Sequence, residues 1–454
     1  MHLTARDRTL LSGPVTTVRE PDRPDVPAQA DPQVSETVST MLAEIEREGL
    51  PAVRRYAERL DGWTGGEDFE VSSDQVTALT DDLPDDLKAA LDAGAERTRR
   101  FADMQRAHLT DFEAEVIPGV VCGQRYVPVN NVGAYLPAGR FPLLASAFMT
   151  VGVARAAEVP NVVSCTPPSR QGQPHPAVLY AARASGAERI FALGGVQALA
   201  AMAFGLLDGQ PADMIVGAGN AFVAEAKRQL YGKVGIDVLA GPSEVAVIAD
   251  DTATPEMVAA DLLAQAEHGP SSPACLVTTS AELGAAVEVE IERQLGGLAT
   301  RDIAGAAWRD WGSIYVADSA KTAVEVMDLL APEHLEILTA DPDFYLEHLH
   351  NYGSLFLGTW STVAYADKGM SGTNHVLPTA RGAKHTGGLS VAGFLKQLTY
   401  QRATREATRT QAEPTVAVSA FEALVGHRDS AQIRLDMIGA DVPHPVHAYE
   451  QLAR

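Results

Sequence analysis

Apolar runs and polar interruptions alternate regularly between Phe141 and Gly217. Short apolar runs of strand length recur there, separated by stretches with helical spacing. The expected order is an apolar helix within Pro142–Ala157, a strand at Val162–Cys165, a helix at Pro176–Ser185, a strand at Arg189–Leu193, a helix from Gln197 and a strand at Asp213–Val216. Alternation of this kind predicts a parallel sheet whose strands are joined by helical crossovers.

A second alternating series extends from Ile236 to about Gly358. Its strand candidates are Val245–Ala249, Ala274–Thr278, Gly312–Val316 and Ser354–Leu357. Two series in tandem predict an α/β protein with two parallel-sheet domains and a ligand cleft where the domains meet.

The flanking segments differ from these series. Residues up to Gln33 are rich in Pro, Asp and Arg and are typical of an extended arm, whereas Val34–Leu60 has helical spacing broken at Gly49–Pro51. Two or three further helices and a strand at Val120–Tyr126 are expected next. Beyond Arg381, helices with charged faces predict a tail of the kind that packs on a partner subunit. The expected boundaries are an arm at 1–33, a helical region with the first strands at 34–134, two sheet domains at 135–238 and 239–380, and the tail at 381–454.

Composition narrows the class of protein. The chain has 454 residues, 46% of them hydrophobic, and a formal net charge of -23. This acidity argues against nucleic acid or an anionic membrane as a partner, because phosphate binding needs clustered Lys and Arg. The longest apolar stretch, Pro142–Ala157, contains Arg155 and is better explained as a buried helix than as a membrane span. With no apolar segment of signal-peptide type at the N-terminus, we expect a cytoplasmic protein.

The chain contains three cysteines, Cys122, Cys165 and Cys275. They are widely spaced and lie among apolar neighbours, a pattern typical of inert core thiols. The alternative is a catalytic thiol at Cys275, of the kind that forms thiohemiacetals in aldehyde oxidation.

The most informative stretch is Asp261–His268, which follows the small-residue turn Ala240–Glu244 and a buried strand. A helix through this stretch would place Gln265 and His268 on one face, aimed at a common point. These two side chains are candidates for half of a metal site.

Other polar groups have a functional and a plain structural interpretation. Glu333 and His334 stand at the expected start of a helix or turn. They are interpreted either as two separate acid–base groups or as a helix N-cap with an incidental histidine. His375 lies in a loop that follows Asp367 and Lys368, a pattern compatible with metal binding or with an ordinary polar loop.

Glu422 and His427 lie on the last helical stretch, five residues apart and therefore about 140° apart around a regular helix. They could belong to one wide site, or they could simply lie on a solvent-facing helix surface.

Three turns after strands are candidates for a dinucleotide site. Gly217–Asn220 opens a helical run at Ala221–Tyr231, Gly194–Gln197 is a second turn of this type, and Gly133–Pro137 includes the aromatic Tyr135. Glycines at such turns let a phosphate approach the backbone at a helix N-terminus. A plain tight turn is the alternative at each place.

Taken in this order, the segments resemble the histidinol dehydrogenase family from about Val34 to Arg434. The resemblance is carried by the strings AGPSEVAVIAD at Ala240–Asp250, DLLAQAEHGP at Asp261–Pro270, APEHLEI at Ala331–Ile337, GSLFLG at Gly353–Gly358 and SGTNHVLPT at Ser371–Thr379. It implies a homodimer of subunits with two Rossmann-like parallel-sheet domains, N-terminal helices and a C-terminal helical tail that packs on the partner subunit. It also implies NAD and one zinc ion per subunit.

The resemblance also implies roles for individual residues. Zinc is assigned to Gln265, His268, Asp367 and the partner subunit's His427. His334 becomes the general base for the alcohol, and Glu333 the base that activates water at the aldehyde stage. The remaining assignments are substrate contacts at Ser243, His375 and Glu422 and NAD contacts at Tyr135, Gln197 and Asn220.

One departure from the biosynthetic pattern bears on the substrate. The stretch Ala366–Met370 carries one extra residue, so that Lys368 takes the register of the loop ligand that we assign to Asp367. The segment Gly387–Gln401 is also more similar to the paralogous branch typified by sulfopropanediol dehydrogenase. In that branch Lys368, or an arginine such as Arg381, would face a sulfonate.

The first candidate function is therefore oxidation of L-histidinol through the aldehyde to L-histidine, in histidine biosynthesis, by two hydride transfers. The alternative within the family is a paralogue that acts on an anionic diol such as 2,3-dihydroxypropane-1-sulfonate. Two further alternatives are a catalytically silent zinc-binding scaffold and a nucleotide-binding α/β protein without a metal.

Overall fold

The computed structural model describes residues 1–23, 32–64, 68–139, 141–169 and 172–439, so residues 440–454 of the expected tail lie outside it. The chain forms two compact units. The first comprises Met1–His108 and Pro128–Leu395, and the second comprises Leu109–Val127 and Lys396–Arg454.

A six-stranded sheet in the order β1-β11-β10-β9-β12-β13 forms one part of the first unit. Its strands are β1 (Val15–Arg19), β9 (Val245–Ala249), β10 (Ala274–Thr278), β11 (Gly312–Ala317), β12 (His334–Leu338) and β13 (Ser354–Leu357). The strands from β9 to β13 pair in parallel, and β1 joins β11 in the antiparallel sense. The associated helices are α1 (Ala5–Arg8), α10 (Pro255–Ala266), α11 (Ala281–Leu295), α12 (Arg301–Trp311), α13 (Ala320–Leu330), α14 (Pro342–His348) and α15 (Val363–Asp367).

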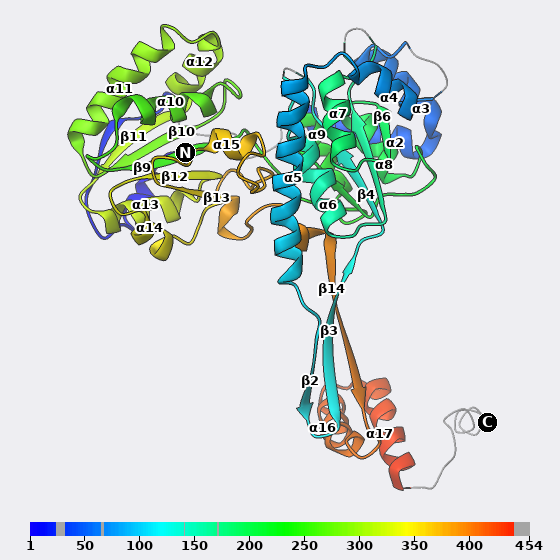
Figure 1. Cartoon of the computed structure of the whole chain (residues 1–454). Coiled ribbons are helices and arrows are strands. Elements are labelled where there is room, and N and C mark those ends of the chain that lie inside the picture. Colours follow the sequence, from blue (N-terminus) through cyan, green and yellow to red (C-terminus); the bar gives the residue numbers. More distant parts are fainter. Residues whose placement is uncertain (24–31, 65–67, 140, 170–171, 440–454) are drawn as a thin grey trace. The chain divides into compact units, whose positions relative to one another are not determined.

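Both faces of this sheet are covered, as a parallel sheet requires. In β9, Val247 packs on one face with residues such as Leu262 of α10, and Ile248 packs on the other with residues such as Met327 of α13. Figure 1 shows α10, α11 and α12 over one face and α13 and α14 over the other. Every residue of β9 is buried, which explains the unbroken apolar run in its sequence.

The first unit also contains a five-stranded parallel sheet in the order β6-β5-β4-β7-β8. Its strands are β4 (Asn131–Tyr135), β5 (Asn161–Thr166), β6 (Arg189–Ala192), β7 (Met214–Val216) and β8 (Gly235–Ile236). The helices around it are α2 (Pro32–Glu48), α3 (Leu50–Tyr56), α4 (Ser73–Thr80), α5 (Asp85–Ala107), α6 (Val153–Ala156), α7 (Pro176–Ala184), α8 (Gly195–Ala203) and α9 (Ala221–Leu230), with π-helical turns at Ala57–Asp61 and Phe148–Gly152.

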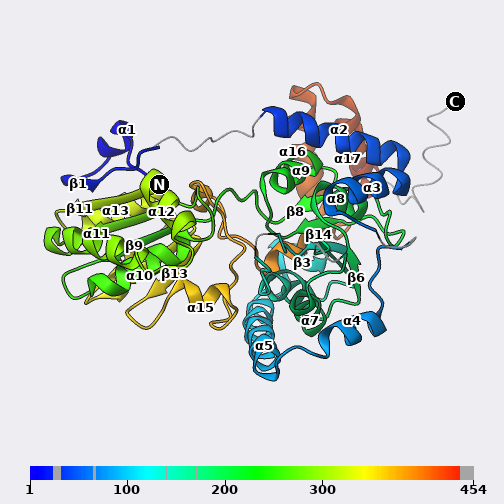
Figure 2. The ribbon, with the colours of Figure 1, turned by 90° about the horizontal axis from the view of Figure 1, so that it is seen from above.

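The strand order of this sheet reverses direction at β4. Successive strands β4, β5 and β6 extend to one side, and β7 and β8 extend to the other. Figure 2 shows α2, α3, α8 and α9 gathered on one side of the sheet and α5 and α7 on the other. In open α/β sheets the crevice for a ligand lies at such a reversal, outside the carboxyl ends of the two strands. Those ends are Tyr135 in β4 and Val216 in β7.

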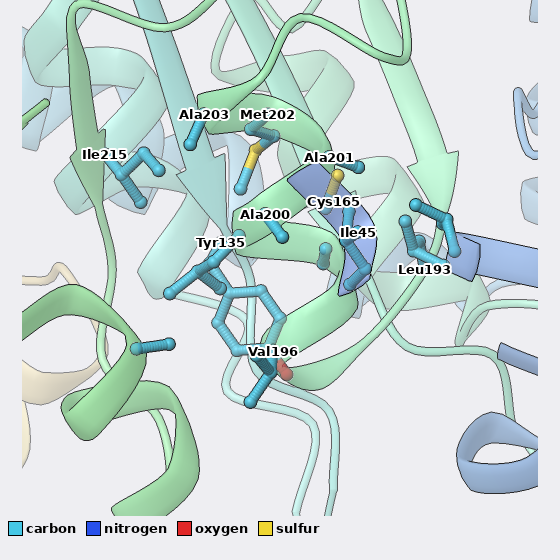
Figure 3. Packing of buried hydrophobic residues seen from close by; sticks show 14 of the residues in the cluster. Ile45, Tyr135, Cys165, Leu193, Val196, Ala200, Ala201, Met202, Ala203 and Ile215 are labelled. Atoms are coloured by element: carbon cyan, nitrogen blue, oxygen red, sulfur yellow. The ribbon is translucent and has the colours of Figure 1, made fainter. Parts of the chain in front are cut away.

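Tyr135 is buried in the hydrophobic core that packs on this sheet. It is 6% exposed and belongs to an apolar cluster with Val196, Met202 and Ile215. In Figure 3 its ring extends toward Val196, near the start of α8. The packing holds the ring at the carboxyl edge of the sheet.

The second unit has a three-stranded sheet in the order β14-β3-β2 and two helices. Its elements are β2 (Phe112–Ile117), β3 (Val120–Pro128), β14 (Leu395–Ala403), α16 (Thr408–Phe421) and α17 (Val425–Gly439). Two 3₁₀ turns, Gly382–Lys384 and Val391–Phe394, precede β14. Tyr400 fastens β14 to this unit by donating its hydroxyl to Glu113 of β2 at 2.6 Å.

Three local predictions are wrong. His334 opens strand β12 rather than a helix or turn, because Leu335 and Ile337 alternate onto one core face between β9 and β13. Helix α10 ends at Ala266, so His268 lies in the turn behind it. Glu422 and His427 lie on different elements, because the chain breaks between α16 and α17, where Ala423 adopts a positive φ of 59°.

A search of the described residues finds no helix with the length and apolar character needed to cross a bilayer. The apolar stretch around Phe148–Ala156 is instead a π-helical turn followed by the short helix α6, both buried in the first unit. The expectation of a buried helical segment there is confirmed.

A buried ion pair fastens the turn that follows β7. The ammonium group of Lys227 on α9 contacts the carboxylate of Asp237 and also donates to Gly217 O at 3.0 Å. Asp237 accepts a hydrogen bond from Gly217 N at 2.7 Å. Gly217 has a φ of 118°, and a Cβ at this position would lie 2.1 Å from Tyr135 O, so only glycine fits.

We expect Lys227→Met to lower the free energy of unfolding by about 3–5 kcal/mol, because it leaves the Asp237 carboxylate buried without its cation. The measurement is urea denaturation, monitored by the fluorescence of the tryptophan residues. The control is Lys233→Met, which removes the exposed partner of Glu46 and should cost less than about 1 kcal/mol. Equal losses in the two variants would contradict the assigned importance of the buried pair.

Candidate active site

The candidate active site lies at the amino ends of β9 and β12. These strands are neighbours, with Val245 opposite His334, so Ser243 and Glu244 before β9 stand beside Glu333 before β12. A helix that connects parallel strands runs back along the sheet, and the end of α10 therefore returns to the same edge. Gln265 lies in the last turn of α10.

Glu333 is the centre of a hydrogen-bond chain. Its Oε2 accepts from Ser243 Oγ at 2.7 Å and from Glu244 N at 2.8 Å. Ser243 Oγ in turn accepts from Gln265 Nε2 at 2.5 Å. Because the amide nitrogen of Gln265 is used in this way, its Oε1 is left buried without a hydrogen-bond partner among the described residues.

The geometry around His334 identifies which nitrogen can act as a base. Nδ1 lies 3.0 Å from Glu244 O, an atom that only accepts, so Nδ1 carries a proton. Nε2 is buried and has no hydrogen-bond partner within the described residues. Burial alone would lower the pKa of His334, but Glu333, with Nδ1 3.4 Å from its Oε2, and then Asp367 raise this pKa to about 9.

Asp367, the last residue of α15, is surrounded by imidazole groups. Its carboxylate oxygens lie 3.5 Å from His268 Nε2, 3.8 Å from His334 Nε2 and 3.9 Å from His375 Nδ1. Burial would raise the pKa of Asp367, but the three histidines and Lys368 together lower it. Burial lowers the pKa of both His268 and His375, despite the opposing effect of Asp367.

The donors in this unit fit part of a zinc site. Among the described residues no group of three His, Cys, Asp or Glu side chains is arranged around one point for a metal. The predicted set has only two ligands of these types in the first unit, His268 and Asp367, and Gln265 adds an unpartnered amide oxygen. Nitrogen and oxygen donors with a position still open are typical of catalytic zinc. The fourth predicted ligand, His427, lies in the second unit, as does Glu422.

The two candidate cations for an anionic substrate differ in their surroundings. Arg381 donates two hydrogen bonds to Asp7, at 2.9 and 3.2 Å, so its charge is already neutralised within the protein. Lys368 follows Asp367 directly and is exposed. In the described part of the chain it forms no ion pair, and its charge contributes to the lowered pKa of His268. The geometry favours Lys368 over Arg381.

The predicted cofactor residues meet at the carboxyl edge of the five-stranded sheet. The Tyr135 hydroxyl accepts from Gly195 N at 3.1 Å, and Gln197 Nε2 donates to Asp61 Oδ2 at 2.9 Å. Asn220 caps α9 by accepting from Phe222 N and Val223 N. Asp61 was missed by sequence analysis because it lies far from the glycine turns in the chain, at the end of a π-helical turn.

Several amide groups of these turns are already engaged. Asp61 accepts from Gly194 N at 2.9 Å, Tyr135 accepts from Gly195 N, and Asp237 accepts from Gly217 N. These three N–H groups are therefore not offered to a phosphate. Gln197 Oε1 is buried at this edge without a hydrogen-bond partner among the described residues.

The alternative of a catalytic thiol at Cys275 is wrong. Cys275 is fully buried within β10, and burial raises the pKa of its thiol to about 11. Burial raises the pKa of the Cys165 thiol even further. Neither group supplies a thiolate near neutral pH.

The chain is similar to known proteins over most of its length. Residues 25–435 match the family model described as histidinol dehydrogenase. The chain is 47% identical to a histidinol dehydrogenase homolog of Shouchella clausii, over 90% of this chain and 95% of the relative. It is 44% identical to sulfopropanediol 3-dehydrogenase of Ruegeria pomeroyi, over 88% of this chain and 92% of the relative. The crystal structure of histidinol dehydrogenase from Elizabethkingia anophelis superposes with a TM-score of 0.86 at 35% identity, covering 92% of this chain and 95% of that one.

Proposed function

The chain belongs to the histidinol dehydrogenase family, and on that premise we propose that it is a zinc- and NAD-dependent enzyme that oxidises a small anionic alcohol through the aldehyde to the carboxylate. One observation carries the proposal. His334 Nε2, a buried base without a hydrogen-bond partner among the described residues, faces Asp367, while Glu333 is held by Ser243 and Glu244. Such an intact acid–base pair argues against a catalytically silent scaffold.

The residues that would hold zinc are Gln265, His268, Asp367 and the partner subunit's His427. Bound zinc would orient the polar groups of the substrate, and NAD would accept one hydride in each oxidation. For NAD, the proposed contacts are Tyr135, Gln197 and Asn220, at the strand-order reversal where α/β sheets bind ligands. The function of a metal-free nucleotide-binding protein would not require the side chains that converge at the amino ends of β9 and β12 in the six-stranded sheet.

In the first oxidation the neutral form of His334, which its raised pKa of about 9 makes available at alkaline pH, takes the proton of the alcohol on Nε2. Its Nδ1 remains hydrogen bonded to Glu244 O, which fixes the orientation of the ring as the charge develops. The nearby Glu333 carboxylate stabilises the imidazolium that results.

In the second oxidation Glu333 removes a proton from the water that adds to the aldehyde. Ser243 and Glu244 N hold Oε2, so Oε1 is the atom directed to the water. With a second NAD bound, the hydrated aldehyde would give up a hydride to the cofactor and its hydroxyl protons to a base or solvent, and would leave as the carboxylate. A positioned water thus does the work that a cysteine does in enzymes with a thiohemiacetal.

The surroundings of the site favour an anionic substrate. Lys368 presents a positive charge beside His268 and Asp367, and sulfopropanediol 3-dehydrogenase is among the relatives at 44% identity. We therefore propose an alcohol such as 2,3-dihydroxypropane-1-sulfonate. The Glu422 carboxylate, if supplied by a partner subunit, favours the second candidate, the cationic amino alcohol L-histidinol.

The test is NADH released per molecule of limiting substrate by zinc-replete protein at mildly alkaline pH. We expect about two NADH from the sulfonated diol, one for each hydride transferred. Two from L-histidinol and none from the diol would select the second candidate. No NADH from either, with zinc bound, would overturn the proposed activity on both substrates.

Lys368→Met should raise the KM for the sulfonated diol about tenfold or more and change kcat little, because it removes a charged contact made before and during the reaction. Lys321→Met, an exposed lysine on α13 that lies away from the site residues in sequence and fold, is the matched control. Steady-state kinetics of both variants provide the measurement. An unchanged KM for Lys368→Met would exclude this residue from substrate recognition.

Glu333→Gln should separate the two oxidations. Because the amide keeps the shape of the side chain but cannot accept a proton from water, turnover of added aldehyde should fall about 100-fold or more, with a much smaller loss for the alcohol. His334→Ala should slow the alcohol step by a comparable factor. Equal aldehyde turnover by Glu333→Gln and the unmodified enzyme, measured in single-turnover experiments, would refute this division of labour.

We propose that the enzyme is a homodimer in which each second unit completes the partner's site. The second unit leaves Phe421 95% exposed and Val116 65% exposed, as expected of a surface that another chain covers. Glu422 directly follows Phe421, so burial of this aromatic side chain in an interface would carry a substrate-binding candidate into it.

Mixing two inactive variants tests the shared site. Heterodimers of His427→Ala and Gln265→Ala subunits contain one site with both residues intact. A random 1:1 mixture should therefore regain about one quarter of the normal activity. Subunit exchange would be verified by differently tagged chains, and an absence of activity in isolated heterodimers would show that His427 acts within its own subunit.

A further inference from the structure

We infer that Asp261 and Glu336 share one proton and act as a clamp that positions the three elements carrying the proposed zinc ligands and general base. This inference rests on the proposed zinc-dependent function. It assigns a role to two carboxyl groups that the proposed mechanism does not use.

The pair joins α10, β12 and α15. Asp261 on α10 and Glu336 on β12 lie close enough for the Asp261 carboxyl group to raise the pKa of Glu336. Glu336 Oε1 accepts from Val363 N, the first residue of α15, at 2.7 Å. Asp261 Oδ1 accepts from the hydroxyl of Thr362, the N-cap of α15, at 3.1 Å. Both carboxyl groups thus accept hydrogen bonds from the first residues of α15.

Each element carries a proposed functional residue a short distance from the pair. Gln265 follows Asp261 by one helical turn on α10, and His334 precedes Glu336 by two positions on β12. Asp367 ends the short helix that Thr362 and Val363 begin. A shift of α15 relative to α10 would move Asp367 away from Gln265 and His268, so the clamp sets the spacing between these ligands.

One proton must lie between the two carboxyl groups. Glu336 is fully buried, and its Oε2 has no N–H or O–H donor among the described residues. The part of the chain that the structure describes also provides no ion pair with a Lys, Arg or His to either residue. Two ionised carboxylates in such a place would repel each other and lose their hydration, whereas a shared proton turns the contact into a hydrogen bond.

The surroundings agree with this assignment. Burial and then the neighbouring Asp261 raise the pKa of Glu336 well above its ordinary range, against the effect of Val363 N. Burial likewise raises the pKa of Asp261. A protonated carboxyl group and an amide can make the same hydrogen bonds here, which gives a conservative variant for each position.

The experiment is titration of the full-length apo-protein with zinc alone, in competition with a chelating indicator. Glu336→Gln can accept from Val363 N and donate to Asp261, so its zinc Kd should stay within about threefold of the unmodified protein. Glu336→Met keeps the length of the side chain but removes both hydrogen bonds, and its Kd should rise about tenfold or more. Asp261→Asn and Asp261→Leu form a second pair with the same expected contrast, which decides the question if Glu336→Met fails to fold.

Val277→Ala provides the control for general destabilisation. Val277 is buried in β10 on the sheet face away from α10, so this variant should lower the Tm without changing the zinc Kd. The inference is overturned by an unchanged Kd in Glu336→Met and Asp261→Leu, by a Kd in Glu336→Gln as weak as in Glu336→Met, or by an equal loss in Val277→Ala. Unmodified protein that binds no zinc would instead overturn the proposed function, and this inference with it.

Discussion

The site depends on the parallel pairing of β9 with β12, with Val245 opposite His334. Two segments separated by about ninety residues enter the sheet side by side through this register, which brings Ser243 and Glu244 against Glu333. A shift of one residue would turn every side chain of β12 to the opposite face and would send His334 away from Glu244 O. The register thus sets the acid–base geometry before any ligand binds.

The two sheets of the first unit use opposite edges. The proposed cofactor residues lie at the carboxyl ends of β4, β6 and β7, as is usual in α/β proteins. The proposed acid–base residues lie at the amino ends of β9 and β12, where the end of α10 returns. Helix α10 presents its C-terminal end, not its N-terminal end, to that edge, and side chains such as Gln265 supply the polar groups there. Hydrogen bonds between side chains therefore take the place that a helix N-terminus has at the other sheet.

Sequence patterns were sufficient for elements whose burial is uniform. Val245–Ala249 and Ala274–Thr278 were predicted as strands with the bounds that the structure has, because every residue of each strand is buried between the two apolar faces of a parallel sheet. Ser354–Leu357 was also predicted with its observed bounds, although this strand lies at the edge of the sheet and is mostly half-buried. Strand β12 was missed because Pro332 and Glu333 have the local character of a helix start, and only pairing with β9 on one side and β13 on the other selects the strand.

The parts of the site that escaped prediction are those made by contacts distant in sequence. Nothing near Gln197 in the chain indicates that Asp61 will hold its amide, and nothing near Gly217 indicates that Asp237 will take its N–H. Arg381 was a reasonable candidate for an anionic substrate until Asp7, almost at the other end of the chain, proved to occupy it. The candidate side chains were recognisable from their motifs, but their availability was not.

Glu333, which directly precedes β12, and Glu336, which lies within this strand, are the same type of residue in different surroundings. Glu333 accepts two hydrogen bonds, from Ser243 Oγ and Glu244 N, and is the group proposed to take a proton from water. Glu336, three residues further on, receives one from Val363 N and faces another carboxyl group in the core. The surroundings of Glu336 favour a retained proton. The proposed base therefore stands at the entrance of β12 and the proposed proton-sharing group lies inside the strand, and this difference follows from the neighbours of each carboxyl group.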